Sequence, residues 1–212
     1  MSHPPSTRTT LTYGLLRHGQ TLWNSQKRVQ GQGNSPLTET GKEETAAWAA
    51  YLAGQGWQHI LCSNLGRVQE TVTLLNAVLN LPVTVDARLR EQDWGDWEGM
   101  KVADVHRDCA EELAVQAAKG WDFRPPGGES RREVRDRAFA ALAAARSTSA
   151  AERILVVCHL GVIKCLVYTV AGRKFLADEP SLLEKEGMHH LYYRENAYHL
   201  GPLNITVKDE PQ

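Results

Sequence analysis

Five side chains that could take part in chemistry follow strand-like apolar runs in this sequence. They are Arg17, His18, Arg67, Glu91 and His159. The runs that precede them are residues 11–16, 59–63, 83–85 and 154–157. Open α/β sheets bind their ligands at the carboxyl ends of the strands. We therefore expect these five side chains to converge on one crevice.

Two arginines and two histidines in one crevice suit a dianionic phosphate group. Arg17 and Arg67 can each bind phosphate oxygens through two parallel N–H groups, which a lysine cannot do. The N-terminus of a helix that follows a strand adds backbone N–H groups and a favourable dipole. The pattern thus predicts a phosphate-binding site that needs no metal ion.

The chemistry expected at this site is nucleophilic attack on phosphorus by His18. A neutral imidazole is a good nucleophile when one ring nitrogen is free and the other N–H is held by a backbone carbonyl, here that of Gly19. The phosphoryl group in transit carries charge on its equatorial oxygens. Arg17, Arg67 and a protonated His159 are expected to neutralise this charge.

Glu91 is the candidate proton carrier. A departing alkoxide needs a proton, and the water that later cleaves a phosphohistidine must lose one, so a single carboxyl group can serve both steps. This role requires that burial and the nearby Asp93, Asp96 and Glu98 keep the carboxyl group protonated near neutrality.

Composition excludes several other classes of protein. The chain has 212 residues and 42% hydrophobic residues, enough for one sizeable core, and its net charge of −1 provides no general attraction to nucleic acid or an anionic membrane. It contains no 18-residue apolar run and no apolar signal-peptide region near its N-terminus. Four scattered cysteines without a C-x-x-C pair indicate free thiols in a reducing cytoplasm rather than a zinc site or disulfides.

Alternating strand and helix patterns predict how the chain positions the site. Residues 1–10 are polar and are expected to form a flexible tail, with a single domain over residues 11–208. A helix capped by Thr38 or Thr40 should run to about Ala53. Further helices are expected near 68–79, 130–146 and 161–170, and late strands at 190–193 and 197–200. A helical segment at about 96–128 is expected to lie as an insertion over the sheet. The pattern predicts a three-layer α/β/α sandwich.

Ordered motifs over residues 11–165 resemble those of the histidine phosphatase superfamily, also called phosphoglycerate-mutase-like. RHGQTLWN is similar to its nucleophile signature, and SNLGRVQET and LREQDWGDWEG are similar to its arginine and proton-donor segments. PPGGES is similar to a stretch common in the phosphatase branch, and CHLGVIK resembles the second-histidine segment. The resemblance implies a mostly parallel mixed sheet with one antiparallel strand.

The resemblance also assigns site residues. It implies that His18 is the nucleophile, that Glu91 is the acid and base, and that the phosphate pocket contains the residues Arg17, Asn24, Gln30, Arg67 and His159. Four positions depart from the usual family pattern, namely Gln20, Asn64, Leu160 and Lys164. None of them removes a predicted catalytic group, but they leave the substrate pocket undefined. No cofactor is implied.

Three other functions are consistent with parts of the sequence. Cys158 begins a C-x5-K run, but a cysteine phosphatase requires C-x5-R to clamp phosphate. A phosphomutase on the same scaffold would have to exclude water, and the family's cofactor-dependent mutases are longer, with a lid-forming insertion that we do not find. A non-catalytic phosphate-binding module would be expected to lack the nucleophile or the acid, whereas His18 and Glu91 are both present.

The sequence predicts a small phosphate ester as the partner, with no nucleic acid and no membrane. It does not choose among sugar phosphates, phosphoglycerates, nucleotide-like phosphates such as a ribazole phosphate, and broad-specificity turnover. The specificity wall is expected to come from residues 96–128 and the C-terminal segment. The oligomeric state is also open, so a homo-oligomer is compatible with the sequence.

Overall fold

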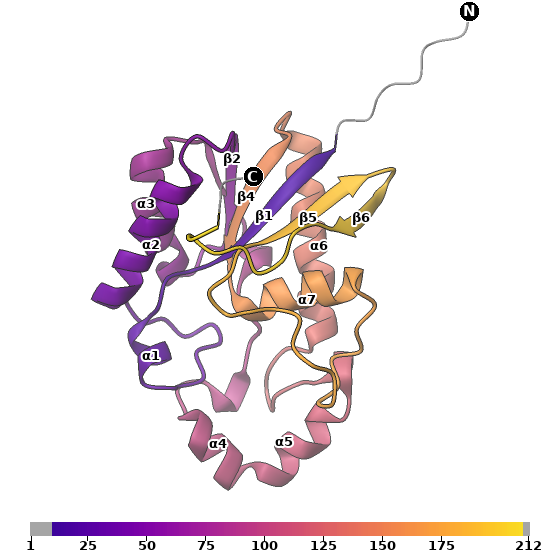
Figure 1. The fold of residues 1–212 in the computed structure, drawn as a ribbon. Coiled ribbons are helices and arrows are strands. Elements are labelled where there is room, and N and C mark those ends of the chain that lie inside the picture. The colour runs from indigo at the N-terminus through magenta and orange to yellow at the C-terminus, as the bar shows by residue number, and fades with distance from the viewer. Residues whose placement is uncertain (1–9, 210–212) are drawn as a thin grey trace, which may run out of the picture.

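The computed structural model describes residues 10–209 (Figure 1). Its strands are β1 (Leu11–Arg17), β2 (His59–Cys62), β3 (Val83–Val85), β4 (Arg153–Cys158), β5 (His189–Arg194) and β6 (Ala197–Leu200). Its α-helices are α1 (Leu22–Ser25), α2 (Glu39–Leu52), α3 (Gly66–Leu79), α4 (Val102–Asp108), α5 (Ala110–Ala117), α6 (Arg131–Thr148) and α7 (Leu160–Val170). Short 3-10 helices cover Ala87–Leu89, Gly95–Trp97 and Gly120–Asp122. Apart from Thr10, the tail predicted over 1–10 lies outside the described residues.

The six strands form one mixed sheet in the order β3-β2-β4-β1-β5-β6. Strand β4 lies between β1 and β2 and is parallel to both, and β3 is parallel to β2. Strand β5 is antiparallel to β1, and β6 is antiparallel to β5. Among the described strands, β5 therefore runs alone against the direction of the others, and the mostly parallel mixed sheet is confirmed.

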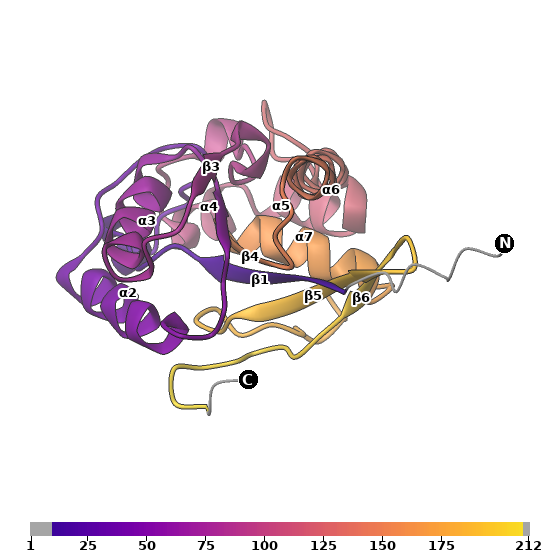
Figure 2. The ribbon, with the colours of Figure 1, turned by 90° about the horizontal axis from the view of Figure 1, so that it is seen from above.

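The central strand β4 shows why the sheet is covered on both faces. Ile154 and Val156 belong to a cluster with residues of α6 and α7, whereas Leu155 and Val157 belong to a cluster with residues of α2 and α3. All four side chains are fully buried, and each contributes about 1.5–3 kcal/mol relative to an exposed position. Figure 2 shows the two helix pairs on opposite sides of the sheet. The three-layer sandwich is confirmed.

Local capping fixes where the main helices begin. Helix α2 is capped by Thr38, whose Oγ1 accepts a hydrogen bond from the Gly41 N–H at 3.0 Å, so Thr38 rather than Thr40 is the cap. Helix α6 begins with a reciprocal pair in which Ser130 Oγ accepts from the Glu133 N–H and Glu133 accepts from the Ser130 N–H. Each such cap stabilises a helix by about 1 kcal/mol.

The predicted position of the 96–128 segment is wrong. The segment contains α4 and α5, separated at Cys109, and it lies beyond the carboxyl ends of the parallel strands rather than over a face of the sheet (Figure 1). Its apolar side chains form a separate small cluster in which Trp97, Val105 and Phe123 pack with Val29 from the loop between α1 and α2. Packing within this cluster, and not on the sheet, explains the position.

Candidate active site

His18 follows β1 directly and is held in a defined tautomer. Its backbone N–H donates to the Cys158 carbonyl at 3.1 Å, and its Nδ1 lies 2.8 Å from the Gly19 carbonyl oxygen. A carbonyl can only accept, so Nδ1 carries the proton and Nε2 keeps a lone pair. Burial, together with the charges of Arg17 and Arg67, places the pKa of His18 well below 6.5. The predicted contact with Gly19 and the neutral imidazole are both confirmed.

Arg67 connects the two histidines. It lies in the first turn of α3, is 1% exposed, and donates to the carbonyl oxygens of Gly31 and Gly33, each at 2.7 Å. Its Nε lies 3.2 Å from Nε2 of His18, and its Nη2 lies 3.1 Å from Nδ1 of His159. Burial lowers the pKa of Arg67 to about 10, so the guanidinium group keeps its charge at neutral pH.

His159, at the N-cap position of α7, is neutral in this site. Because Arg67 can only donate, Nδ1 of His159 accepts, and Nε2–H of the neutral ring donates to Ser63 Oγ at 3.0 Å. Burial, with Arg67 and His18 beside the ring, lowers the pKa of His159 well below 6.5. In the phosphate-free site the ring is neutral, because a buried cation next to a guanidinium group is unfavourable. The expectation of a protonated His159 concerns the phosphoryl group in transit and stays a prediction.

Arg17 and Glu91 complete the cluster. The Nε atom of Arg17 is buried and has no hydrogen-bond partner within residues 10–209. Burial lowers the pKa of Arg17, while the charges of Glu91, Glu186 and Glu44 oppose this effect. A guanidinium group with a buried, unused N–H beside the nucleophile is suited to binding an anionic oxygen.

The Glu91 carboxylate lies against the start of α7. One oxygen accepts from the Gly161 N–H at 3.1 Å, and the other accepts from the Gln92 N–H at 2.8 Å. A Cβ atom at position 161 would lie 2.2 Å from Glu91 Oε1, so only glycine allows the carboxylate to come this close. This contact places the Glu91 carboxylate at the N-terminus of α7, the helix whose N-cap residue is His159.

The three acidic residues that were expected to keep Glu91 protonated differ in their surroundings. Asp93 accepts from the Gly95 N–H at 2.8 Å, and Asp96 is exposed to solvent. The Glu98 carboxylate accepts from the backbone N–H groups of Gln32 and Gly33. The carboxylates of Asp93 and Glu98 thus bind backbone N–H groups of turns. The protonated state expected of Glu91 stays a prediction, whereas the position of Glu91 agrees with the sequence-based expectation.

Asn24 and Gln30 form a hydrogen-bond network with Thr21 and Ser35. The Asn24 side chain accepts from the Thr21 N–H at 3.1 Å and donates to Gln30 Oε1 at 3.3 Å. Gln30 Oε1 also accepts from Thr21 Oγ1, and Gln30 Nε2 donates to Ser35 Oγ. Phosphate contact by Asn24 and Gln30 stays a prediction.

Sequence reasoning missed the groups that hold the two key side chains. Ser63 directly follows β2 and binds His159, but a serine after a strand carries no signal of that pairing. The loop containing Gly31 and Gly33 supplies carbonyl acceptors for Arg67, and Glu98 holds this loop from the other side. The only available signal was the Gly-x-Gly spacing, which is weak alone.

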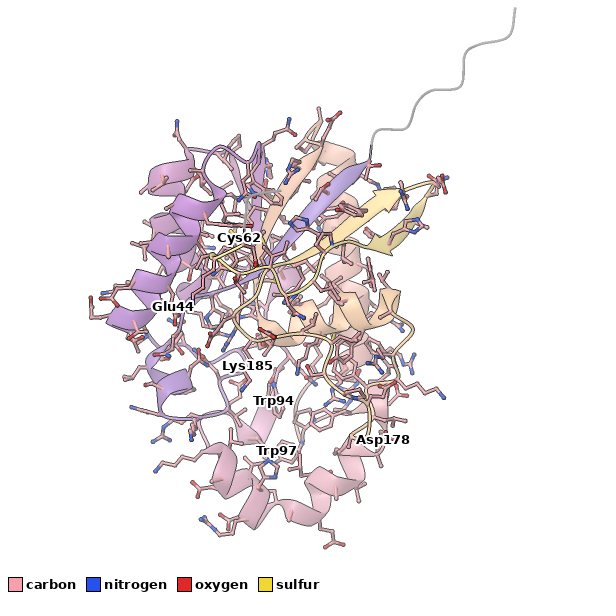
Figure 3. All side chains as sticks on the ribbon, viewed as in Figure 1. Glu44, Cys62, Trp94, Trp97, Asp178 and Lys185 are labelled. Atoms are coloured by element: carbon pink, nitrogen blue, oxygen red, sulfur yellow. The ribbon has the colours of Figure 1, made fainter. Side chains whose placement is uncertain are left out.

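Two further sequence interpretations can be judged from side-chain packing. Trp94 and Trp97, labelled in Figure 3, pack against Phe123 at ring-centroid distances of 5.6 and 6.3 Å, as core residues do. Cys158 is fully buried, and burial raises the pKa of its thiol far above the ordinary value. A thiol in this environment stays protonated and is a poor nucleophile, which argues against a cysteine phosphatase.

Residues 10–209 contain no cluster of three or more His, Cys, Asp or Glu side chains arranged to hold a metal ion. Within the same residues, no helix has both the length and the apolar character required to span a bilayer.

The cluster can support phosphoryl transfer to a histidine nitrogen. It brings together the lone pair of His18 Nε2, the guanidinium groups of Arg17 and Arg67, and the Glu91 carboxylate. Arg67 Nε donates to the same lone pair that would attack phosphorus. A bound phosphate must therefore take over this N–H, which frees the lone pair at the moment the anion is in place.

Comparison with known proteins points to one family. The sequence matches the profile of the histidine phosphatase superfamily (branch 1) over residues 14–206. It is 34% identical over 185 residues to a Salmonella paratyphi B protein named Probable phosphoglycerate mutase GpmB, covering 87% of this chain and 86% of that protein.

Solved structures with the same fold carry phosphatase names. A mycobacterial glucosyl-3-phosphoglycerate phosphatase in complex with VO3 superposes with a TM-score of 0.83 and 27% identity, covering 92% of this chain and 100% of that one. The alpha-ribazole phosphatase from Shigella flexneri superposes with a TM-score of 0.79 and 25% identity, covering 94% and 100%.

Proposed function

We infer that this chain, which belongs to the histidine phosphatase superfamily (branch 1), hydrolyses a small phosphate monoester through a phosphohistidine on His18. The observation that carries the proposal is the state of His18. Its Nδ1–H is bound to the Gly19 carbonyl, and its deprotonated Nε2 lies 3.2 Å from the buried Arg67 guanidinium group. A neutral imidazole beside a fixed cation is prepared to attack a phosphate that the cation binds.

The proposed reaction has two steps. His18 Nε2 attacks phosphorus and the ester P–O bond breaks, while Arg17 and Arg67 bind the equatorial oxygens. Glu91 gives a proton to the leaving alkoxide. In the second step a water attacks the phosphohistidine, Glu91 takes a proton from this water, the P–N bond breaks, and inorganic phosphate leaves.

A phosphatase is favoured over a phosphomutase. The structures that superpose over more than nine-tenths of this chain include phosphatases for glucosyl-3-phosphoglycerate and alpha-ribazole phosphate. The observation that favours a mutase is the 34% identity to the Salmonella protein. The two functions differ in the acceptor of the phosphoryl group, which is water in a phosphatase and a second substrate hydroxyl in a mutase.

The deciding experiment is a panel of phosphate esters with the products identified. Sugar phosphates, phosphoglycerates and a ribazole phosphate are incubated with the protein, and inorganic phosphate and positional isomers are both measured. Phosphate release with no isomer supports the phosphatase. Isomerisation faster than phosphate release would establish the mutase instead.

Trapping tests the nucleophile. Rapid quench with labelled substrate should give an acid-labile phosphoenzyme in the native protein and none in His18→Ala, whose kcat should fall by several orders of magnitude. Activity near the native level in His18→Ala would refute the mechanism.

The role of Glu91 has its own test, because the need for a proton depends on the leaving group. An alkyl ester leaves as a strong base, whereas p-nitrophenyl phosphate leaves as a weak one. Glu91→Gln should slow phosphoenzyme formation severely with the alkyl ester and far less with the nitrophenyl ester. Equal losses would remove Glu91 from the role, and Asp93 and Asp96 would then be compared in the same way.

We further propose that the reaction needs no metal ion and no nucleic-acid or membrane partner, and takes place in the cytoplasm. Arg17 and Arg67 supply the positive charge at the phosphate, and the cysteines are free thiols, three of them buried. A chelator should leave the rate unchanged. A strict magnesium requirement for hydrolysis of the free ester would contradict metal independence.

A further inference from the structure

Arg137 on α6 binds the segment that carries Glu91. Its Nη1 donates to the carbonyl oxygens of Arg88 and Arg90, each at 2.6 Å, and its Nη2 donates to the carbonyl oxygen of Glu91 at 3.0 Å. One side chain thus donates to three backbone carbonyl oxygens of residues 88–91, a segment that has only a three-residue 3-10 helix of its own. The backbone at Glu91 is held from α6 and not by the sheet.

Glu129 fixes the orientation of this guanidinium group. Its carboxylate accepts from Arg137 Nε at 2.7 Å and from Arg137 Nη2 at 2.8 Å. All five N–H groups of Arg137 therefore have acceptors, two on Glu129 and three on the 88–91 backbone. Both side chains are 19% exposed, so solvent competes little with these bonds.

Glu129 also binds the chain on the other side of Glu91. Its carbonyl oxygen accepts from Gln92 Nε2 at 2.7 Å, and its backbone N–H donates to the Asp93 carbonyl at 3.0 Å. Arg137 and Glu129 together hold residues 88–93, with Glu91 in the middle and its carboxylate directed to Gly161. We call this pair the 129/137 clamp.

We propose that Arg137 is a positioning residue, which holds the Glu91 carboxyl group at the distance from the leaving oxygen that proton transfer requires. The proposal rests on the proposed function, in which Glu91 protonates the leaving group. A displacement of a catalytic group by about 1 Å costs about 10²-fold in rate. A side chain that binds the carbonyl oxygens of Arg88, Arg90 and Glu91 controls displacements of that size.

A purely structural role makes a different prediction. Loss of the clamp would then lower stability, or slow every substrate to the same extent. A positioning role acts only on the step in which Glu91 transfers a proton, so its effect must depend on the basicity of the leaving group. Lysine at position 137 keeps the positive charge but loses the planar fork, which separates geometry from charge.

The test measures phosphoenzyme formation by rapid quench in Arg137→Lys, with an alkyl phosphate and with p-nitrophenyl phosphate, at a temperature where circular dichroism shows folded protein. We expect a loss of about 30-fold or more with the alkyl ester and of less than about threefold with the nitrophenyl ester. Glu129→Gln, which weakens the clamp from its other side, should show the same selectivity and serves if Arg137→Lys does not fold.

Arg131 provides the matched control on the same helix. It is also a carbonyl-binding arginine, but its Nη1 donates to Gly120 and Phe175, away from residues 88–93. Arg131→Lys should leave the ratio of the two rates at the native value. A shifted ratio in Arg131→Lys would overturn the proposal, because general loosening of α6 would then explain the effect.

A double variant distinguishes failure of this proposal from failure of the proposed function. If Arg137 acts through Glu91, Arg137→Lys should add no further loss with the alkyl ester in the Glu91→Gln background. Equal losses on both esters in Arg137→Lys, or a full additional loss in the double variant, would overturn the positioning role while leaving Glu91 as the acid. Absence of leaving-group dependence in Glu91→Gln itself would overturn both.

Discussion

The Glu98 carboxylate holds the loop that orients Arg67, and replacing it with an amide is a demanding test of the site. Its Oε1 accepts from the N–H groups of Gln32 at 2.6 Å and Trp94 at 3.2 Å, and its Oε2 accepts from the Gly33 N–H at 3.0 Å. The same loop supplies the carbonyl oxygens that accept from Arg67.

The expected loss in the free energy of unfolding follows from the number of these hydrogen bonds that the substitution removes. Glu98→Gln preserves the shape but replaces one accepting oxygen with an NH2 group, so at least one backbone N–H loses its acceptor and faces another donor. An unsatisfied buried donor costs about 1–3 kcal/mol, and the bonds that remain lose their charge-assisted strength. We expect the free energy of unfolding to fall by about 2–3 kcal/mol.

Activity should fall in a way that does not depend on the leaving group. In the proposed mechanism Arg67 binds the phosphate group, which every substrate shares, so a loosened loop should lower kcat/KM by about 10-fold for alkyl and nitrophenyl esters alike. This pattern is the opposite of the one expected when Glu91 is displaced.

The assay combines urea denaturation at pH 7 with steady-state kinetics on both esters. Glu133→Gln is a suitable control, because Glu133 also accepts a backbone N–H but caps α6 at Ser130, so it should lose stability and keep kcat/KM. If Glu98→Gln loses under about 0.5 kcal/mol of stability and keeps kcat/KM within about twofold, the loop does not orient Arg67 and the reasoning fails.

Three further outcomes follow from the same geometry. Arg67→Lys should lower kcat/KM by about 100-fold, because one ammonium group cannot replace a fork that binds two carbonyls and a phosphate; a loss below about threefold, or ~0.7 kcal/mol, would mark Arg67 as dispensable. Gly161→Ala places a Cβ 2.2 Å from Glu91 Oε1, so rapid quench should show slower phosphoenzyme formation from alkyl esters, by about 10-fold or more, with p-nitrophenyl phosphate little affected. Burial lowers the pKa of His189 and His190 to about 4, whereas the pKa of an unfolded histidine is about 6.5. Between these two pH values the unfolded chain binds more protons than the folded chain, so the free energy of unfolding decreases as the pH falls. The expected decrease is about 2 kcal/mol per histidine at pH 5. Urea denaturation at pH 7 and pH 5 checks this expectation. The decrease in the free energy of unfolding between the two pH values should be smaller by about 2 kcal/mol in His190→Gln, and it should be unchanged in the exposed control His106→Gln.

The sequence by itself determined the elements and the chemical groups at their ends. The apolar run around Val156 is a strand buried on both faces, as its composition requires, and Ser130 with Glu133 marks the start of α6. The tautomer of His18 was also predictable, because the Gly19 carbonyl is adjacent in the chain. These features depend on neighbours within a few residues, which a linear pattern records.

Tertiary structure decided how the groups meet and in which protonation state. Arg67 binds His159 across 92 residues, Ser63 binds His159 across 96, and Glu98 binds the loop at Gln32 across 66. The sequence could not predict that His159 is neutral, because its pKa depends on full burial beside a guanidinium group from another helix. Periodicity and capping describe one element at a time, whereas distances between side chains on different elements are set by how the layers pack, and pKa values follow those distances.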